Sequence, residues 1–240
     1  MSETKLSFKR YEKKYLLSPE RGEAVRRALE GRVVPDLYFK STVCSLYYDT
    51  DDYALIRRSI EAPVYKEKLR LRSYGVPGPD DTVFVELKKK FEGMVYKRRI
   101  TMSAAAASAC LAGGETPNGG DQMMKELEWF LRQNRVSPKV FIACDRTAWV
   151  AKDEPELRIT FDENLRWRTD ELDLCLGSHG ESLTEPGWSL MEIKMPGAAP
   201  LWLAHLLSEL EVFPTGFSKY GTCYTNHILN DFFKGVTECV

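Results

Sequence analysis

A ten-residue stretch, Tyr65–Tyr74, alternates basic side chains with others along its length. In an extended strand successive side chains point to opposite faces, so every second residue shares a face. The basic residues of this stretch therefore gather on one side: Lys66, Lys68, Arg70 and Arg72. The other side carries Glu67, Leu69, Leu71 and Ser73. An ordinary surface strand alternates too, so the pattern is informative only if other strands repeat it.

The alternation does recur in several other segments, which place charged residues on one face and apolar residues on the other. The charged face collects Glu12, Lys14, Arg70, Arg72, Glu86, Lys88, Lys97, Arg146, Arg158, Asp162, Glu192 and Lys194. Basic side chains converge poorly by themselves, because like charges repel and burial lowers the pKa of lysine. A phosphate chain would resolve this, since arginine offers paired donors and lysine a compact charge. The sequence therefore predicts a face that binds a polyanion.

The acidic residues on this face leave two interpretations open. They can be salt-bridge partners of the bases, or oxygen ligands for Mg²⁺ or Mn²⁺ bridging phosphate oxygens; they are Glu12, Glu86, Asp162 and Glu192. Ser218 and Lys219 open the last predicted helix, where they can cap it or contact an anion. No nucleotide-binding glycine motif is present. The three histidines, His179, His205 and His227, fall off the charged strands, so we expect packing or surface roles for them.

Composition narrows the class of protein. The chain has 240 residues, 43% of them hydrophobic, and no Pro/Gly/Ser-rich linker, so we expect a single domain over residues 1–240. A net charge of −1 argues against a general nucleic-acid-binding protein. The six cysteines are scattered without paired spacing, which favours reduced core thiols. No apolar run reaches the roughly 18 residues of a membrane span, so we expect a cytoplasmic protein without a membrane segment.

Periodicity and turn residues predict the elements that position the charged face. Strands are expected over residues 8–17, 43–49, 64–74, 82–90, 94–102, 139–151, 156–162 and 188–195, with an irregular hairpin over 165–176. Helices are expected over residues 19–30, 50–60, 103–111, 121–134, 200–210 and 218–233. Three aspartates, Asp49, Asp51 and Asp52, open the second of these helices.

About eight long strands in hairpin order predict a mainly β α+β fold whose antiparallel sheet closes into a barrel, since closure removes exposed edges. Two ways of closing the sheet into a barrel fit the alternation of charged and apolar side chains. An apolar interior would leave the charges outside, whereas a polar interior would give a charged tunnel with helices packed on its apolar exterior. The amphipathic helices need an apolar surface, which favours the tunnel, but alternation alone is compatible with both.

Eight segments, taken in order, resemble one family. They are Arg10–Tyr15, Ser45–Asp49, Lys68–Gly75, Glu86–Lys88, the Asp145-Arg146-Thr-Ala stretch, Leu157–Asp162, Met191–Lys194 and Phe217–Tyr220. Each motif is weak alone, but the ordered set resembles the VTC domain, the catalytic module of polyphosphate polymerases among the triphosphate tunnel metalloenzymes. The resemblance spans residues 8–225. CYTH relatives begin with Glu-x-Glu-x-Lys; here Arg10 takes the first position, which fits the VTC branch better.

The resemblance implies an eight-stranded antiparallel β-tunnel with a charged lumen, and helices outside it and at the C-terminus. It implies phosphate binding by Lys14, Arg70, Arg72, Lys88, Lys97, Arg146, Arg158, Lys194, Ser218 and Lys219. The residues expected to act most directly in catalysis are Arg70, Arg72, Arg146 and Lys219. Glu192, with Glu12 and Glu86, is expected to hold Mn²⁺ or Mg²⁺.

The implied activity is transfer of the ATP γ-phosphate to a polyphosphate chain. A metal-dependent tripolyphosphatase or nucleoside triphosphatase is the alternative enzyme, and a polyphosphate-binding module without activity is the third reading. The expected partners are ATP and inorganic polyphosphate or tripolyphosphate, with no nucleic acid. The SPX domain and membrane segments of the eukaryotic complexes have no counterpart here, so we expect that the chain does not itself translocate product.

Overall fold

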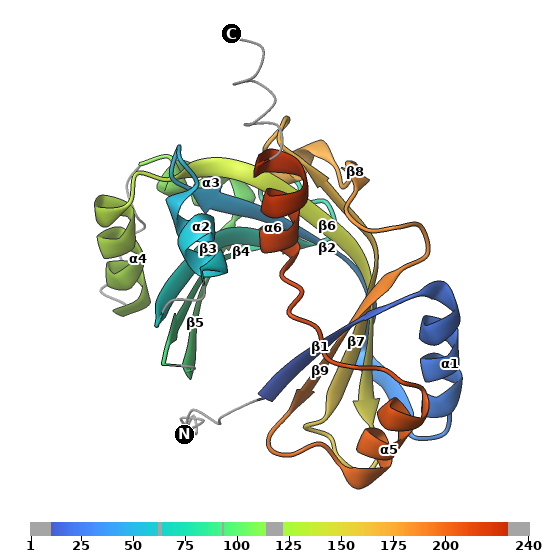
Figure 1. Ribbon diagram of the computed structural model, residues 1–240. Helices are drawn as coiled ribbons and strands as arrows, with labels where there is room; N and C mark the ends of the chain where they lie inside the picture. The colour runs from blue at the N-terminus through green and yellow to red at the C-terminus, as the bar shows by residue number, and fades with distance from the viewer. Residues whose placement is uncertain (1–10, 62–63, 93, 114–121, 230–240) are drawn as a thin grey trace, which may run out of the picture. The chain divides into compact units, whose positions relative to one another are not determined.

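The fold is α+β and consists mainly of antiparallel strands (Figure 1). The computed structural model describes residues 11–61, 64–92, 94–113 and 122–229. Its strands are β1 (Tyr11–Leu17), β2 (Val33–Asp49), β3 (Tyr65–Tyr74), β4 (Thr82–Phe91), β5 (Met94–Ser103), β6 (Ser137–Ala151), β7 (Arg158–Arg168), β8 (Glu181–Ser182) and β9 (Ser189–Met195). Its helices are α1 (Pro19–Leu29), α2 (Ala54–Ile60), α3 (Ala104–Leu111), α4 (Gln122–Gln133), α5 (Leu201–Glu209) and α6 (Lys219–Cys223), with short 3₁₀ and π turns at Leu174–Leu176 and Tyr224–Ile228.

The strands are hydrogen-bonded in the order β1-β9-β7-β6-β2-β3-β4-β5, and β8 pairs with β7. The prediction of a mainly β, antiparallel α+β fold is confirmed. Two details differ from it. A ninth, two-residue strand is present, and the strand order of the described residues ends at β1 and β5, so hydrogen bonds do not close the sheet into a barrel.

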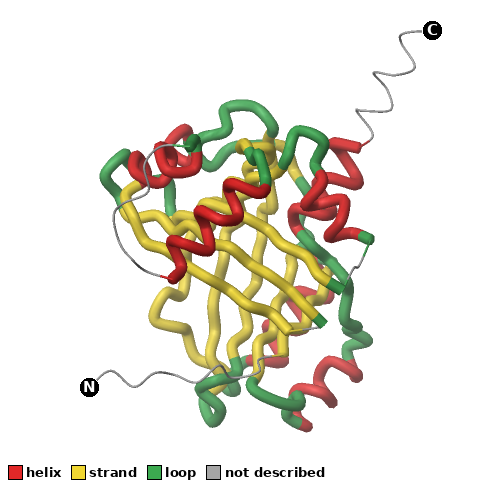
Figure 2. The backbone as a smooth tube through the Cα atoms, turned by 90° about the vertical axis from the view of Figure 1, so that its left-hand side faces the viewer, coloured by secondary structure: helices red, strands yellow, loops and turns green. Residues whose placement is uncertain are grey.

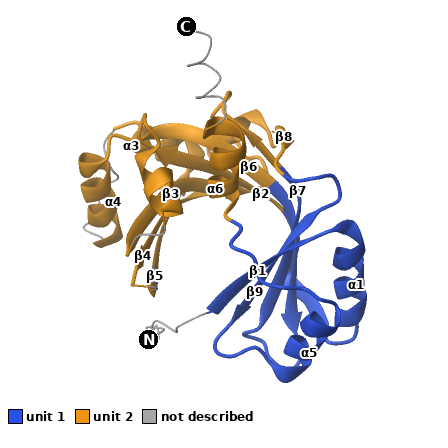
Figure 3. Ribbon diagram, in the orientation of Figure 1, with its two compact units in different colours: residues 1–41, 144–165, 184–217 blue, residues 42–143, 166–183, 218–240 orange. Residues whose placement is uncertain are grey.

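The chain divides into two compact units, coloured separately in Figure 3. Unit 1 comprises residues 1–41, 144–165 and 184–217. In this unit α1 and α5 pack on the apolar face of β1, β7 and β9. The buried side chains of this core include Tyr15, Leu17, Val25, Leu29, Leu157, Ile159, Phe161, Met191, Ile193, Leu203 and Leu206.

Unit 2 comprises residues 42–143, 166–183 and 218–240. Here α3 and α4 cover the apolar face of β3, β4 and β5, and α4 lies across these strands in Figure 2. The core of this unit includes Leu46, Leu69, Leu71, Val83, Val85, Leu87, Ala107, Leu127, Phe130 and Phe141. Thus α1 and α5 in unit 1, and α3 and α4 in unit 2, cover the apolar face of the strands, whereas α6 lies on the charged side of unit 2, where Tyr220 stacks on Tyr47. Helices packed on the apolar face are what the polar-lumen alternative requires.

Element boundaries depart from the prediction in several places, and α2 begins at Ala54, four residues after its predicted start. Strand β2 begins at Val33, ten residues before the predicted start, and β7 continues to Arg168 through the predicted hairpin. The last predicted helix is α6 followed by a π turn over Tyr224–Ile228, and its predicted end lies outside the described residues. The predicted turn at Phe91–Gly93 also ends outside them.

Two further features bear on the expected class of protein. Five cysteines lie in the described part of the chain as free thiols, and Cys44, Cys110, Cys144 and Cys223 are buried. None of the helices that the structure describes is long and apolar enough to cross a membrane.

Candidate phosphate-binding site

A row of three lysines crosses the charged face of unit 2. Lys68 on β3 lies opposite Lys88 on β4, and Lys88 lies opposite Lys97 on β5. Like charges that face each other directly across a sheet are destabilising. This lysine row therefore concentrates positive charge, and an anion bound across it would offset the repulsion.

The next row is centred on Glu86, whose side chain is only 1% exposed. One oxygen, Oε2, lies 2.6 Å from Arg70 Nη2 and 3.9 Å from Arg72 Nε. The other oxygen, Oε1, lies 2.6 Å from Lys97 Nζ and 2.5 Å from Arg99 Nη2. One carboxylate thus holds four cations together, and we call these five residues the Glu86 cluster.

The Glu86 cluster keeps a surplus of positive charge. Although burial alone would raise the pKa of Glu86, the charges of Arg70, Arg72 and Lys97 hold it far below its usual range. Burial also raises the pKa of Tyr47, but Arg70, Arg72 and Lys219 outweigh this effect and the net shift is downward. Both shifts show a positive potential at this face, which suits phosphate better than a metal ion.

Neutral side chains hold the two central guanidinium groups in place. Arg70 Nη1 donates to the Tyr47 hydroxyl at 3.2 Å, and Arg72 Nε donates to Ser45 Oγ at 3.3 Å. Tyr47 stacks on Tyr220, with ring centroids 4.8 Å apart. The arginines are therefore oriented before any ligand binds, which lowers the entropy cost of binding.

Helix α6 is fixed to the same part of unit 2 by a buried aspartate. The Tyr220 hydroxyl donates to Asp49 Oδ2 at 2.9 Å. Asp49 also accepts from the backbone N–H groups of Leu55 and Ile56, both at 2.9 Å, so it caps α2. This role explains one of the three aspartates that precede α2 in the sequence.

Ser218 and Lys219 lie at the start of α6. Ser218 Oγ accepts from the Gly221 N–H at 3.3 Å, as an N-cap does, and from Lys68 Nζ at 3.1 Å. The N-cap therefore also contacts the lysine row. Both predicted roles of Ser218 are compatible with this geometry.

Unit 1 carries a second charged face, formed by β1, β9 and β7. Lys14 lies opposite Glu192, and Glu192 lies opposite Thr160. Lys14 Nζ is 3.6 Å from Oε1 of Glu192 and 3.6 Å from Oε1 of Glu12. Lys194 Nζ is 3.6 Å from the other oxygen of Glu192. These distances exceed a hydrogen bond, so these three contacts of the Glu192 cluster are ion pairs only.

Arg146 and Arg158 of unit 1 are both paired with aspartates. Arg146 binds Asp162 through two contacts, of 2.5 and 2.7 Å, and the Asp162 side chain is 0% exposed. This pairing raises the pKa of Arg146 further, despite its burial. Arg158 contacts Asp36 and is more exposed. Arg146 is therefore held rigidly on a buried carboxylate, whereas Arg158 lies at the edge of the charged face.

The carboxylates differ in how well they fit a divalent cation. Glu86 fits poorly, because both of its oxygens already bind cations. Glu12 and Glu192 fit better, since Mg²⁺ and Mn²⁺ commonly take one or two carboxylates and complete their shell with phosphate oxygens. Among the described residues no group of three or more His, Cys, Asp or Glu side chains could hold a metal. A cation here would thus depend on oxygens from a bound phosphate.

The structure adds residues that the sequence reasoning did not select as site residues. Arg99 lies opposite Glu86 and contacts it at 2.5 Å, and Lys68 belongs to the lysine row. Arg99 has the same alternation as Lys97, so the period of two was a signal for it. Tyr47 and Ser45 had no such signal, because their role depends on the pairing of β2 with β3.

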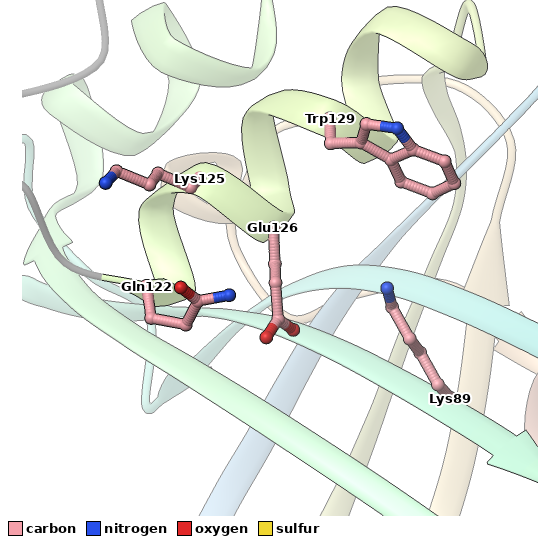
Figure 4. A pocket seen from close by; sticks show the side chains of 5 residues that line it. All are labelled: Lys89, Gln122, Lys125, Glu126 and Trp129. Atoms are coloured by element: carbon pink, nitrogen blue, oxygen red, sulfur yellow. The ribbon is translucent and has the colours of Figure 1, made fainter.

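A pocket of about 240 Å³ lies elsewhere, between α4 and β4 (Figure 4). It is lined by Lys89, Gln122, Lys125, Glu126 and Trp129. Lys89 alternates with Lys88 and so points to the helix-covered face of β4, where it lies over the Trp129 ring at 5.6 Å. This pocket contains none of the predicted site residues, so we place the candidate site on the charged faces instead.

Comparison of the sequence with known proteins identifies the family to which this chain belongs. A family model of the VTC domain matches residues 9–227. A vacuolar transporter chaperone complex subunit 4 from Trypanosoma cruzi (strain CL Brener) is 26% identical over 222 residues, covering 75% of this chain. The matched part is only 27% of that relative's length, so the chain spans about a quarter of it.

A crystal structure from Bacillus halodurans, of a protein proposed to be an adenylate cyclase, is similar in fold. It has a TM-score of 0.53 at 15% sequence identity, and the match covers 86% of this chain and 92% of that one. At this identity the likeness concerns the fold alone.

Proposed function

This chain belongs to the VTC domain family, and from that premise we propose that it is a polyphosphate polymerase. The reaction is transfer of the γ-phosphoryl group of ATP to the terminal phosphate of a polyphosphate chain. The bond between the β,γ-bridging oxygen and the γ-phosphorus breaks, and a terminal oxygen of the chain forms the new bond. The products are ADP and a chain longer by one phosphate.

The observation that carries the proposal is the charge of unit 2. The lysine row and the four cations around Glu86 lie on adjoining rows of three strands, with one carboxylate among them. A chain of phosphates can contact several of these groups along its length, whereas a single phosphate cannot reach them all. The repeated rows therefore favour a linear polyanion over an isolated anion.

The residues have separate roles in this mechanism. Arg70 and Arg72, held by Tyr47 and Ser45, orient phosphoryl oxygens and neutralise charge that builds up during transfer. Lys219 adds positive charge at the start of α6. Because the accepting phosphate oxygen is already ionised, no general base is required, which agrees with the predicted positions of the histidines away from the charged strands.

The charged face of unit 1, taken by itself, offers a second set of phosphate and metal contacts. Arg146, fixed by Asp162, and Lys14 contact phosphate oxygens, while Glu192 with Glu12 holds Mn²⁺ or Mg²⁺. Such an ion, when bound, neutralises phosphate charge and helps align the transferred group. Glu86 stays an ion-pair partner and is not one of the metal ligands in this proposal.

The test is to incubate the purified protein with ATP and Mn²⁺ and to separate the products on a polyphosphate gel. We expect a ladder of chains together with an equal release of ADP. Release of free phosphate without a ladder would instead identify a hydrolase. Binding of polyphosphate without turnover of ATP would identify the chain as a polyphosphate-binding module without enzymatic activity.

A further inference from the structure

Thr160 on β7 presents a buried hydroxyl group to the charged face of unit 1. Its neighbours Ile159 and Phe161 point into the core, so Thr160 points to the opposite face, between Arg158 and Asp162. The residue is 9% exposed, and Oγ1 has no hydrogen-bond partner among the described residues. Most buried polar atoms in proteins have such a partner, and a missing one destabilises the fold.

The position of this hydroxyl group is informative, because Thr160 lies directly opposite Glu192 in the strand pairing. The two residues share a row with Lys14, which reaches Glu192 at 3.6 Å rather than at hydrogen-bond distance. A carboxylate and a neutral hydroxyl oxygen thus lie side by side on neighbouring strands. Threonine hydroxyl groups are established Mg²⁺ ligands at nucleotide sites, where phosphate oxygens and water complete the shell.

We propose that Thr160 Oγ1 and the Glu192 carboxylate together ligate the divalent cation that enters with a bound phosphate chain. The inference rests on the proposed function, since it adds Thr160 to Glu192 and Glu12 as a ligand of the same cation. It explains why a polar side chain without a protein partner is buried next to Glu192. It also explains how a site with few carboxylates selects a hard cation.

The experiment compares wild type with Thr160→Val, which keeps the side-chain shape but removes the hydroxyl group. Thr160→Ser, which retains the hydroxyl group, is the matched control. Mn²⁺ is titrated calorimetrically into each protein saturated with tripolyphosphate. We expect Thr160→Val to bind Mn²⁺ about tenfold more weakly, the lower end of the range for lost support at metal sites. Thr160→Ser should stay close to wild type.

Two metal-free measurements complete the test. The melting temperature of Thr160→Val should equal or exceed that of wild type, because the hydroxyl has no protein partner to lose. Tripolyphosphate affinity without Mn²⁺ should be the same in all three proteins. A sharp fall in melting temperature, or a loss of anion affinity without metal, would overturn the inference by giving the hydroxyl a structural or phosphate-binding role.

Equal Mn²⁺ affinity in wild type and Thr160→Val would also overturn it, as would a wild type that binds tripolyphosphate but no Mn²⁺. In both cases the proposed function survives if wild type still binds tripolyphosphate and makes polyphosphate. If wild type binds no tripolyphosphate at all, the proposed function fails first, and this inference fails with it.

Discussion

At the scale of single residues, the basic side chains are of two kinds. Some share one carboxylate with several other cations, and others form a close ion pair with one carboxylate. Arg72 is of the first kind: its side chain is 12% exposed, and three other cations also neutralise Glu86. Removing Arg72 should leave the unliganded protein nearly as stable as before. It should weaken tripolyphosphate binding by roughly 10- to 100-fold, the worth of one charge-assisted hydrogen bond.

Calorimetric titration of Arg72→Ala with tripolyphosphate measures this effect. The matched control is Arg98→Ala, because Arg98 alternates with Arg99 on β5 and pairs instead with Glu126 of α4. The control should bind tripolyphosphate like wild type. A marked loss of stability in Arg72→Ala with unchanged affinity would show that Arg72 is only an ion-pair partner.

Arg146 is of the second kind, so its replacement should have a different result. Arg146→Ala would remove both guanidinium contacts from the Asp162 carboxylate, whose side chain is 0% exposed. We expect the free energy of unfolding to fall by about 3–5 kcal/mol, as for other broken buried pairs. Urea unfolding of Arg146→Ala and of the Arg146→Ala/Asp162→Ala double variant checks this. The double variant should recover part of the loss; no recovery would mean that Asp162 is satisfied without Arg146.

The lowered pKa of Glu86 predicts that the free energy of unfolding depends on pH. Its pKa is lower in the folded protein than in the unfolded chain, whose value is near 4.5. The carboxylate therefore stabilises the fold fully above that value, and the contribution is lost as the pH falls through the lower folded pKa. The stability difference between wild type and Glu86→Gln should be largest near neutral pH and should shrink in acid. Urea unfolding from pH 7 to pH 3 measures it, and a pH-independent difference would contradict the assignment.

At the scale of elements, the hydroxyl of Tyr220 connects α6 to the cap of α2 through Asp49. Tyr220→Phe removes one donor from a fully buried carboxylate and should cost about 1–3 kcal/mol of unfolding free energy. Because α6 also carries Lys219, tripolyphosphate binding should weaken as well, though less than in Lys219→Ala. The control is Tyr224→Phe, since the Tyr224 hydroxyl has no hydrogen bond within the described residues. Equal effects in both variants would argue against the Asp49 contact.

The elements also show what the sequence could predict. Strands β3, β4 and β5 were predicted to within a residue or two, because their alternation is strict and turn residues bound them. The first part of β2 was missed, since Pro35 and Asp36 are typical of turns and its alternation is weak. There, pairing with neighbouring strands overrides local preference.

The same reasoning explains which features of the candidate site the sequence could not predict. Alternation predicted which residues share the charged face, and therefore most of the lysine row. It could not predict that Glu86 is surrounded by four cations or that Glu192 lies opposite Lys14, because those contacts depend on the register between strands. The buried hydroxyl of Thr160 could not be predicted for the same reason, because threonine is common in strands and carries no signal of its own.

At the scale of the whole molecule, a nearly neutral protein is proposed to bind a strongly charged substrate. The formal net charge is −1, yet many of the bases are concentrated on the strand faces opposite the apolar cores. Local concentration of charge, rather than the net charge, is therefore the basis for proposing a polyanionic partner. Because VTC-family membership rests on a match over residues 9–227, both charged faces belong to the shared domain.

The most direct test of this account is the dependence of affinity on phosphate chain length. Phosphate, pyrophosphate and tripolyphosphate are titrated calorimetrically into metal-free protein at matched ionic strength. Each added phosphate that gains a charge-assisted hydrogen bond should contribute roughly 1.5–3 kcal/mol. The account predicts that tripolyphosphate binds on the order of 100-fold or more tightly than phosphate. Affinities that do not change along this series would contradict it.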